Sequence, residues 1–325
     1  MIYFDNAATT LPDKDILDEY NINSLKLFAN SSSNHKLGLF SNIKLEEARK
    51  DILKTLNLKD HNVIFTSGAT ESINLALKGT AKKYQNRGKH IISVIDEHLA
   101  VKNALEALKN DGFEITYLNI NNKGTISLEE LKKSIRKDTI LVSIMHINNE
   151  LGSINDIKEI SKLLKDYPKI IFHVDATQAI GKTSFNYNDV DLISFSGHKI
   201  HGLKNSGALI YKKKISFVPL NDGGGHEFNY RSGTVDVAKA ISLASAIKKS
   251  YLDLNKNLNH VKELNNYLRE KLNNRDDIII NSDINASPYI FNFSLKNKKA
   301  SVVVEALSNL DIFSTNFLNL VESLL

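Results

Sequence analysis

Short strand-like runs alternate with helix-like stretches through the first two thirds of this chain. The strand-like runs, rich in β-branched and aromatic residues, cover 63–66, 90–95, 114–118, 140–146, 170–174, 192–195 and 207–211. Between several of them, apolar residues recur at helical spacing over 71–84, 99–110, 128–135 and 157–166. Such alternation predicts an α/β fold in which a mostly parallel sheet carries helices on both faces.

The pattern changes in the last third of the chain. Residues 237–272 are typical of two helices interrupted near 255–259, followed by a strand over 289–295 and a helix over 300–307. We therefore expect a large domain over 15–254 and a smaller α+β domain made of 1–14 and 255–325. Because no low-complexity linker separates them, the domains should pack together, with ligands near the carboxyl ends of the strands.

Composition narrows the class of protein. The net charge of +5 comes from 42 basic and 37 acidic residues without a basic block, so we expect no nucleic-acid partner. The sequence has no cysteine, which excludes disulfides and thiolate metal sites within it. It has neither a signal peptide pattern nor a run near the ~20 apolar residues of a membrane span, so a cytoplasmic protein without membrane contact is expected.

A lysine and an aspartate follow two of the expected strands. Asp175 comes directly after the buried run 170–174, and Lys199 follows the Ser-Phe-Ser-Gly-His run at 194–198. A lysine amine forms a Schiff base with the aldehyde of pyridoxal phosphate, and a carboxylate keeps the pyridine nitrogen protonated. Taken alone, Asp175 could equally cap the segment that follows it.

The run Thr-Ser-Gly-Ala-Thr-Glu at 66–71 comes after one strand and opens a helix. Small residues let the backbone approach an anion, and the helix dipole favours negative charge there. Ala69 N–H and Thr70 are thus candidate ligands of the cofactor phosphate. The alternative is an ordinary helix N-terminus capped by Ser67 or Thr70.

Other polar residues also follow strands. Gln178 could reach the phenolic oxygen of the cofactor, Asn149 could bond to cofactor or substrate, and His98 could lie on the pyridine face. Thr234, at a helix start after a glycine-rich loop, could reach a phosphate. Asn149, His98 and Thr234 each have an alternative as a loop, turn or capping residue. All of these candidate residues follow strands in one order, with spacings that a single pyridoxal phosphate site could accommodate. This shared arrangement favours a cofactor site over separate structural roles.

Together these stretches resemble the cysteine desulfurases of the NifS/IscS type, in the class V aminotransferase family. The matching segments are F-D-N-A-A-T-T at 4–10, T-S-G-A-T-E at 66–71, N-N-E-L-G at 148–152, H-V-D-A-T-Q at 173–178, S-G-H-K at 196–199, and G-G-G-H-E with R-S-G-T over 223–234. The resemblance runs almost end to end. It implies the pyridoxal-phosphate-dependent fold type I, with an incomplete small domain.

The resemblance also implies residue roles. Lys199 would carry the Schiff base and move protons at Cα, and His98 would stack on the ring as the second catalytic residue. The implied cofactor contacts are Ala69, Thr70, Asn149, Asp175, Gln178, Ser196, His198, Lys199 and Thr234. Thr234 resembles a residue that reaches the phosphate of the neighbouring subunit, so a homodimer is implied.

The implied reaction converts L-cysteine to alanine. A protein cysteine would take the sulfur as a persulfide for a sulfur-acceptor or iron–sulfur scaffold protein, in iron–sulfur cluster assembly or tRNA thiolation. Here Asn319 stands about where that cysteine is expected, and the chain ends at Leu325, before the arginine that would hold the substrate carboxylate. A frameshift or early stop is one hypothesis for this truncation.

Three functions therefore remain open: an impaired desulfurase, a pyridoxal phosphate enzyme that needs no protein thiol (β-elimination or transamination), and a non-catalytic scaffold or regulator. The incomplete small domain should also expose apolar side chains and lower solubility. Those side chains are Ile290, Phe291, Phe293, Val302, Val303 and Leu307.

Overall fold

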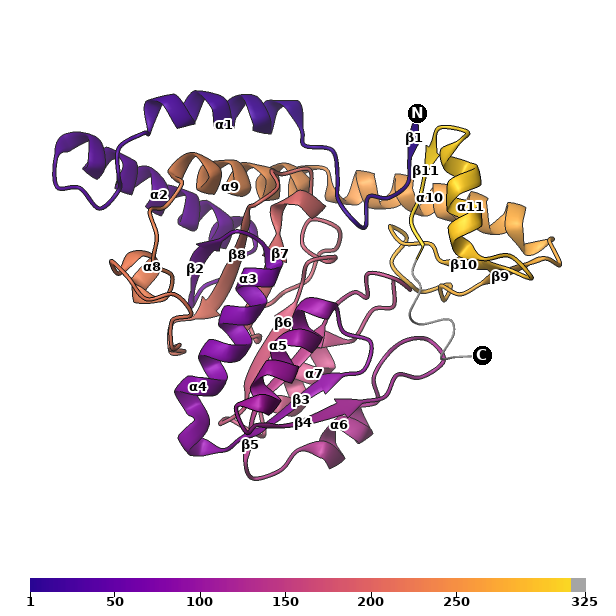
Figure 1. The fold of residues 1–325 in the computed structure, drawn as a ribbon, viewed down its shortest axis with the longest axis horizontal. Coiled ribbons are helices and arrows are strands. Elements are labelled where there is room, and N and C mark those ends of the chain that lie inside the picture. Colours follow the sequence, from indigo (N-terminus) through magenta and orange to yellow (C-terminus); the bar gives the residue numbers. More distant parts are fainter. Residues whose placement is uncertain (317–325) are drawn as a thin grey trace.

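A seven-stranded sheet forms the centre of the computed structural model, which describes residues 1–316 (Figure 1). Its strands, in spatial order, are β2 (His61–Thr66), β8 (Gly207–Lys212), β7 (Leu192–Ser196), β6 (Ile171–Asp175), β5 (Thr139–Met145), β3 (His90–Val94) and β4 (Glu114–Leu118). β8 is the only one of the seven strands that runs opposite to the other six, so the expected mostly parallel sheet is confirmed.

Helices cover both faces of the sheet because alternate strand residues point to opposite sides. Ile64 packs in one core, whereas Val63 and Phe65 pack in the other. The first face carries α3 (Ala69–Asn74), a π-helical turn at Leu75–Gly79, α4 (Thr80–Tyr84) and α5 (Leu99–Asn110). The second carries α1 (Lys14–Lys26), α2 (Lys36–Thr55), α6 (Leu128–Ser134), α7 (Ile157–Leu164) and α9 (Val237–Leu252).

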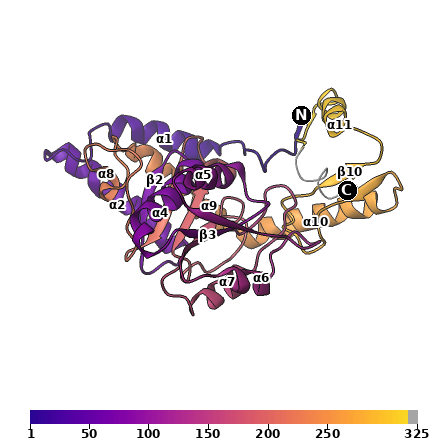
Figure 2. The same ribbon diagram turned by 60° about the horizontal axis from the view of Figure 1, so that its bottom comes forward.

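The short helix α8 (His226–Asn229) lies near β2, whereas the elements that follow the long helix α10 (Leu254–Asn273) gather beside it, away from the main sheet (Figures 1 and 2). They are β9 (Ile278–Ile280), β10 (Phe293–Leu295), α11 (Ala300–Ser308) and β11 (Ile312–Phe313). The N-terminal strand β1 (Ile2–Tyr3) pairs in parallel with β11, so the two ends of the described chain lie together. Where one domain ends and the next begins stays a prediction.

Several expected boundaries differ from the structure. The helix expected over 71–84 begins at Ala69 and includes the π-helical turn, and the break expected near 255–259 lies at Asp253. The strand expected over 289–295 is confined to Phe293–Leu295. Ile290, expected to be exposed, is buried because it packs against Gly152, whereas Val302 is 56% exposed. Among residues 1–316, no helix is long and apolar enough to cross a membrane.

Candidate cofactor site

Most of the expected site residues lie near the ends of β2, β6 and β7. Ser196, the last residue of β7, and Thr66, the last of β2, both pair with Gly207 at the start of β8. Gly207 must be a glycine, because a Cβ there would lie 2.5 Å from the Cα of Gly68. The turn that opens α3 is therefore packed against the start of β8, beside the end of β7.

Lys199 lies just beyond β7, in the 3-10 turn Gly197–Lys199. Its Nζ donates to the carbonyls of Ala7 at 2.6 Å and Ala8 at 2.7 Å. Burial lowers the pKa of Lys199, and the Asp175 and Asp5 carboxylates oppose this shift. A lysine with a lowered pKa is more often neutral, which is the form that attacks an aldehyde.

Asp175, the last residue of β6, is only 7% exposed. Its Oδ1 accepts a hydrogen bond from Thr177 N at 2.9 Å. Burial raises its pKa, and the bonds from Thr177 together with the charges of His98 and Lys199 oppose the rise. A buried carboxylate needs a cationic or N–H partner, and a protonated pyridine nitrogen satisfies that requirement.

His98 lies at the N-terminus of α5, where its Nδ1 accepts from Ala100 N at 3.1 Å. His98 therefore caps α5, as one of the two interpretations of the sequence predicted. His98 is also close enough for the charges of Asp175 and Lys199 to act on its ring. Its imidazole is exposed, so a flat aromatic ligand could lie against it.

A cavity of about 330 Å³ lies at the start of α3. It is lined by 67–71, Thr9, Ser196, His198, Lys204 and Asn205. Within it, Ala69 N donates to Ser196 Oγ at 2.6 Å. Backbone N–H groups, hydroxyls and a lysine suit a phosphate group. The expected phosphate residues Ala69, Thr70, Ser196 and His198 are thus brought together.

His198 holds the N-terminal segment at this cavity. Its Nδ1 lies 3.1 Å from Thr9 Oγ1, and its carbonyl accepts from Thr10 N at 2.8 Å. Burial and the neighbouring lysines lower the pKa of His198 to about 4. The ring is therefore neutral at pH 7 and can donate one hydrogen bond without adding charge.

Gln178 lies between two lysines, one of which sequence reasoning missed. Its Nε2 donates to Ala7 O at 2.9 Å, and its Oε1 accepts from Lys182 Nζ at 2.6 Å. Burial, with a contribution from Lys199, lowers the pKa of Lys182 to about 7. The sequence signal that could have identified Lys182 is its position four residues after Gln178.

Asn149 and Thr234 stay outside this cluster of contacts. Asn149 is half-buried after β5, whereas its neighbour Asn148 donates to Asp96 Oδ2 at 3.0 Å. Thr234 is exposed just before α9, and it does not line the described cavity. Asn319, the position expected for a persulfide cysteine, lies outside the described residues.

Glu97 was also missed, although it directly precedes the expected site residue His98. Its Oε1 accepts from Met145 N at 2.6 Å. Burial, with the Asp175 and Asp96 charges, raises the pKa of Glu97 well above its usual range. Glu97 is therefore more readily protonated than an exposed glutamate, and its buried side chain lies near Asp175.

Residues 2–314 match the family model for class V aminotransferases. The chain belongs to this family. It is 41% identical over 322 residues to a cysteine desulfurase IscS of Buchnera aphidicola subsp. Baizongia pistaciae, covering 96% of this chain and 79% of that protein. The resemblance to NifS/IscS-type desulfurases is therefore confirmed.

Solved structures give the same result for this class V aminotransferase. A NifS-like protein superposes with a TM-score of 0.92 at 35% identity, covering 97% of this chain and 87% of that one. A structure of SspA in complex with cysteine superposes at 0.81 with 31% identity, covering 95% and 87%. The expected fold type is confirmed, and the expected cofactor, pyridoxal phosphate, is that of the family.

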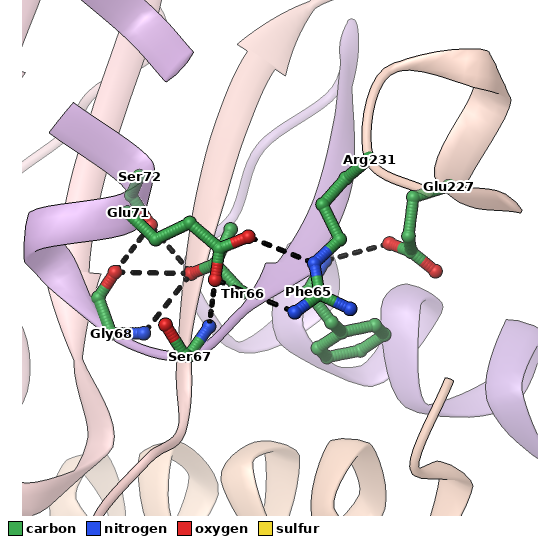
Figure 3. Close-up of polar contacts among 8 residues, drawn as sticks. All are labelled: Phe65, Thr66, Ser67, Gly68, Glu71, Ser72, Glu227 and Arg231. Atoms are coloured by element: carbon green, nitrogen blue, oxygen red, sulfur yellow. Dashed lines mark hydrogen bonds and ion pairs between the residues drawn. The ribbon is translucent and has the colours of Figure 1, made fainter. Parts of the chain in front are cut away.

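The glycine-rich loop at 223–234 is hydrogen-bonded to the end of β2 and to the first turn of α3 (Figure 3). Glu227, 5% exposed, accepts from Phe65 N at 2.7 Å and forms a two-bond ion pair with Arg49. Four residues on, Arg231 Nε donates to Glu71 Oε1 at 2.8 Å. Glu71 Oε2 in turn accepts from Ser67 N at 2.6 Å.

Proposed function

We propose that this protein is a pyridoxal-phosphate-dependent enzyme that acts on L-cysteine in the manner of a cysteine desulfurase. The observation that carries the proposal is a half-buried lysine just after β7 and a buried aspartate at the end of the adjacent strand β6. When bound, pyridoxal phosphate supplies an electron sink that stabilises negative charge at the amino-acid Cα. The similarity to a protein solved with cysteine supports the substrate.

In this proposal, Lys199 binds the cofactor aldehyde and then moves the proton at Cα of the substrate. Ala7 and Ala8 supply carbonyls that hold its Nζ in place before substrate enters. Asp175 keeps a proton on the pyridine nitrogen, because a cation beside its buried carboxylate is favourable. His98 lies against the ring face and keeps water from it.

The other expected contacts divide by the end of the cofactor they serve. Gln178 and Asn149 belong to the ring-oxygen side, and the cavity at the start of α3 takes the phosphate. The phosphate contacts in this proposal are Ala69 N–H, Thr70, Ser196 and His198. Thr234 would serve the partner subunit in a homodimer, which its exposed position allows.

Sulfur transfer is the impaired step in this proposal. None of the 325 residues is a cysteine, so no thiolate of this sequence can carry a persulfide. An amide such as that of Asn319 cannot replace it. Sulfur would instead leave to an external thiol or to a cysteine of an acceptor protein that serves iron–sulfur assembly or tRNA thiolation. We place this chemistry in the cytoplasm, without a nucleic-acid or membrane partner for the chain itself.

The lack of a cysteine in this sequence also favours a second candidate function, β-elimination. β-Elimination of L-cysteine gives pyruvate, ammonia and sulfide, and it requires no protein thiol. Both reactions begin with removal of the proton at Cα, which is the step assigned to Lys199 in this proposal. The product therefore distinguishes the two candidates.

The deciding experiment measures alanine and pyruvate from L-cysteine, with an added thiol, using the cofactor-loaded protein. Lys199→Ala is the blank, because it keeps the cavity but lacks the amine. Alanine that depends on Lys199 would support the desulfurase, and pyruvate would support elimination. Lys199-dependent cofactor absorbance without either product would overturn both.

A further inference from the structure

The cavity proposed for the cofactor phosphate contains a carboxylate. Glu71 lines it together with Ser196, His198 and Lys204, and its side chain is 18% exposed. A free carboxylate beside a phosphate dianion is repulsive, and partial burial strengthens the repulsion. A site that takes phosphate therefore needs some group that neutralises Glu71.

Arg231 is that group. Its Nε donates to Glu71 Oε1 at 2.8 Å, from outside the set of residues that line the cavity. Burial tends to raise the pKa of Glu71, but the bonds from Arg231 and Ser67 outweigh it and the pKa is lowered. Glu71 is therefore ionised, and its charge is matched by a guanidinium.

The bond to Ser67 fixes which way the carboxylate points. Glu71 Oε2 accepts from Ser67 N at 2.6 Å, on the turn that leads from β2 into α3 (Figure 3). With both oxygens occupied, the carboxylate is directed along the turn and toward Arg231. The N–H of Ala69, two residues further on, is left to the cavity and to Ser196 Oγ.

The loop that carries Arg231 has its own anchor. Glu227 binds Arg49 of α2 and the N–H of Phe65 in β2. Phe65 lies two residues before Ser67. The backbone of Glu227 and Phe228 is left-handed, with φ of 50° and 60°, so the loop is held in a conformation that few residues adopt freely. A buried anchor four residues away thus positions Arg231 before any ligand binds.

We propose that Arg231 is a positioning residue that makes the cavity competent for a phosphate monoester by neutralising and orienting Glu71. This inference rests on the proposed cofactor site. Arg231 acts through Glu71 and does not touch the phosphate. Loss of Arg231 leaves an unpaired carboxylate facing the ligand, and removal of that carboxylate in the same protein corrects the defect.

The test compares dissociation constants of pyridoxal phosphate and of pyridoxal, which lacks the phosphate, by equilibrium absorbance titration of the full chain. Arg231→Ala should weaken pyridoxal phosphate binding by roughly tenfold, the effect of one unpaired charge at close range. It should leave pyridoxal nearly unchanged. Glu71→Gln with Arg231→Ala should return the affinity to within about threefold of wild type.

Arg231→Lys tests the same idea with less disturbance, because it keeps the charge and should recover most of the affinity. Arg275→Ala is the matched control, since it breaks an exposed ion pair with Asp277. Equal losses for both ligands would overturn the inference, as would a double variant no better than Arg231→Ala. If the wild type binds pyridoxal phosphate tightly and Arg231→Ala does too, this inference fails while the proposed cofactor site stands. If the wild type does not bind pyridoxal phosphate, both this inference and the proposed cofactor site fail.

Discussion

Lys182 controls the orientation of a neighbouring amide. Lys182 Nζ donates to Gln178 Oε1 at 2.6 Å, which assigns the amide oxygen to the side that faces this lysine. The amide NH2 is thereby turned to Ala7 O, the same carbonyl that accepts from Lys199. The two lysines thus lie within one half-buried network, and burial together with the charge of Lys199 lowers the pKa of Lys182 to about 7.

Lys182→Met should change how stability depends on pH. The folded pKa of about 7 lies below the unfolded value, so between pH 7 and 10 the unfolded chain binds a proton that the folded chain lacks. This term makes wild-type stability rise with pH over that window. Between pH 7 and 9 the variant should gain about 2 kcal/mol less than wild type.

Urea unfolding at pH 7 and 9 measures this difference. Lys162→Met is the matched control, because that lysine side chain is 75% exposed. Parallel pH slopes for wild type and Lys182→Met would show that the buried amine does not titrate in this range.

The residues that end strands were predictable from sequence, and their partners were not. Lys199 and Asp175 follow strongly apolar runs, so local pattern alone placed them at one edge of the sheet. The pairing of Glu71 with Arg231 joins distant parts of the chain, and no local pattern encodes such a contact. Lys182 and Glu97 were missed because burial, which gives them their altered pKa values, is a tertiary property.

At the scale of elements, β8 aligns the two strands that frame the phosphate cavity. It runs antiparallel to both β2 and β7, and its first residue faces the last residue of each. The close approach of Gly207 to Gly68 leaves no room for a side chain. The cavity thus depends on the packing of a strand that supplies none of the proposed ligands.

Gly207→Ala should move the turn that opens α3 and weaken pyridoxal phosphate binding by roughly tenfold or more, because the Cβ must displace backbone. Absorbance titration gives the affinity, and urea unfolding tests that the variant is folded. Gly224→Ala is the control, since a Cβ there meets only His226 at ordinary contact distance. Equal affinities for both variants would contradict the close approach.

Strand positions followed well from sequence because buried strands are marked by continuous β-branched runs. The helices α1 and α2 were missed for a different reason. The buried face of α2 includes Ser41 and Arg49, while Phe40 and Ile43 are about half exposed. Apolar residues therefore occur on more than one face, and the usual periodicity does not stand out.

At the scale of the whole molecule, four histidines are buried among the described residues (His61, His90, His146 and His173), and the pKa shifts are largest for the last two. His146 lies 2.7 Å from Tyr187 Oη, and His173 lies between the hydroxyls of Ser143 and Ser194 at 2.8 and 2.9 Å. Burial lowers the pKa of His146 to about 4 and that of His173 to about 3. Both rings are therefore neutral in the folded protein at pH 7.

Stability should fall as pH drops below about 6.5, because the unfolded histidines then bind protons that the folded ones do not. Each should remove about 2 kcal/mol from the free energy of unfolding by pH 5. His146→Gln should show a smaller loss than wild type between pH 7 and 5 in urea unfolding. His260→Gln, at an exposed position, is the control. An unchanged acid sensitivity in His146→Gln would refute this role.

The parallel pairing of β1 with β11 has a consequence for the order of assembly during synthesis. Residues 2–3 leave the ribosome long before 312–313, so β1 has no strand partner while the main sheet folds. The carbonyls of Ala7 and Ala8, which hold Lys199, lie only a few residues after β1. β1 is therefore paired only after residues 312–313 have been made, and until then the segment over the lysine is held by its own contacts with Lys199, Gln178 and His198.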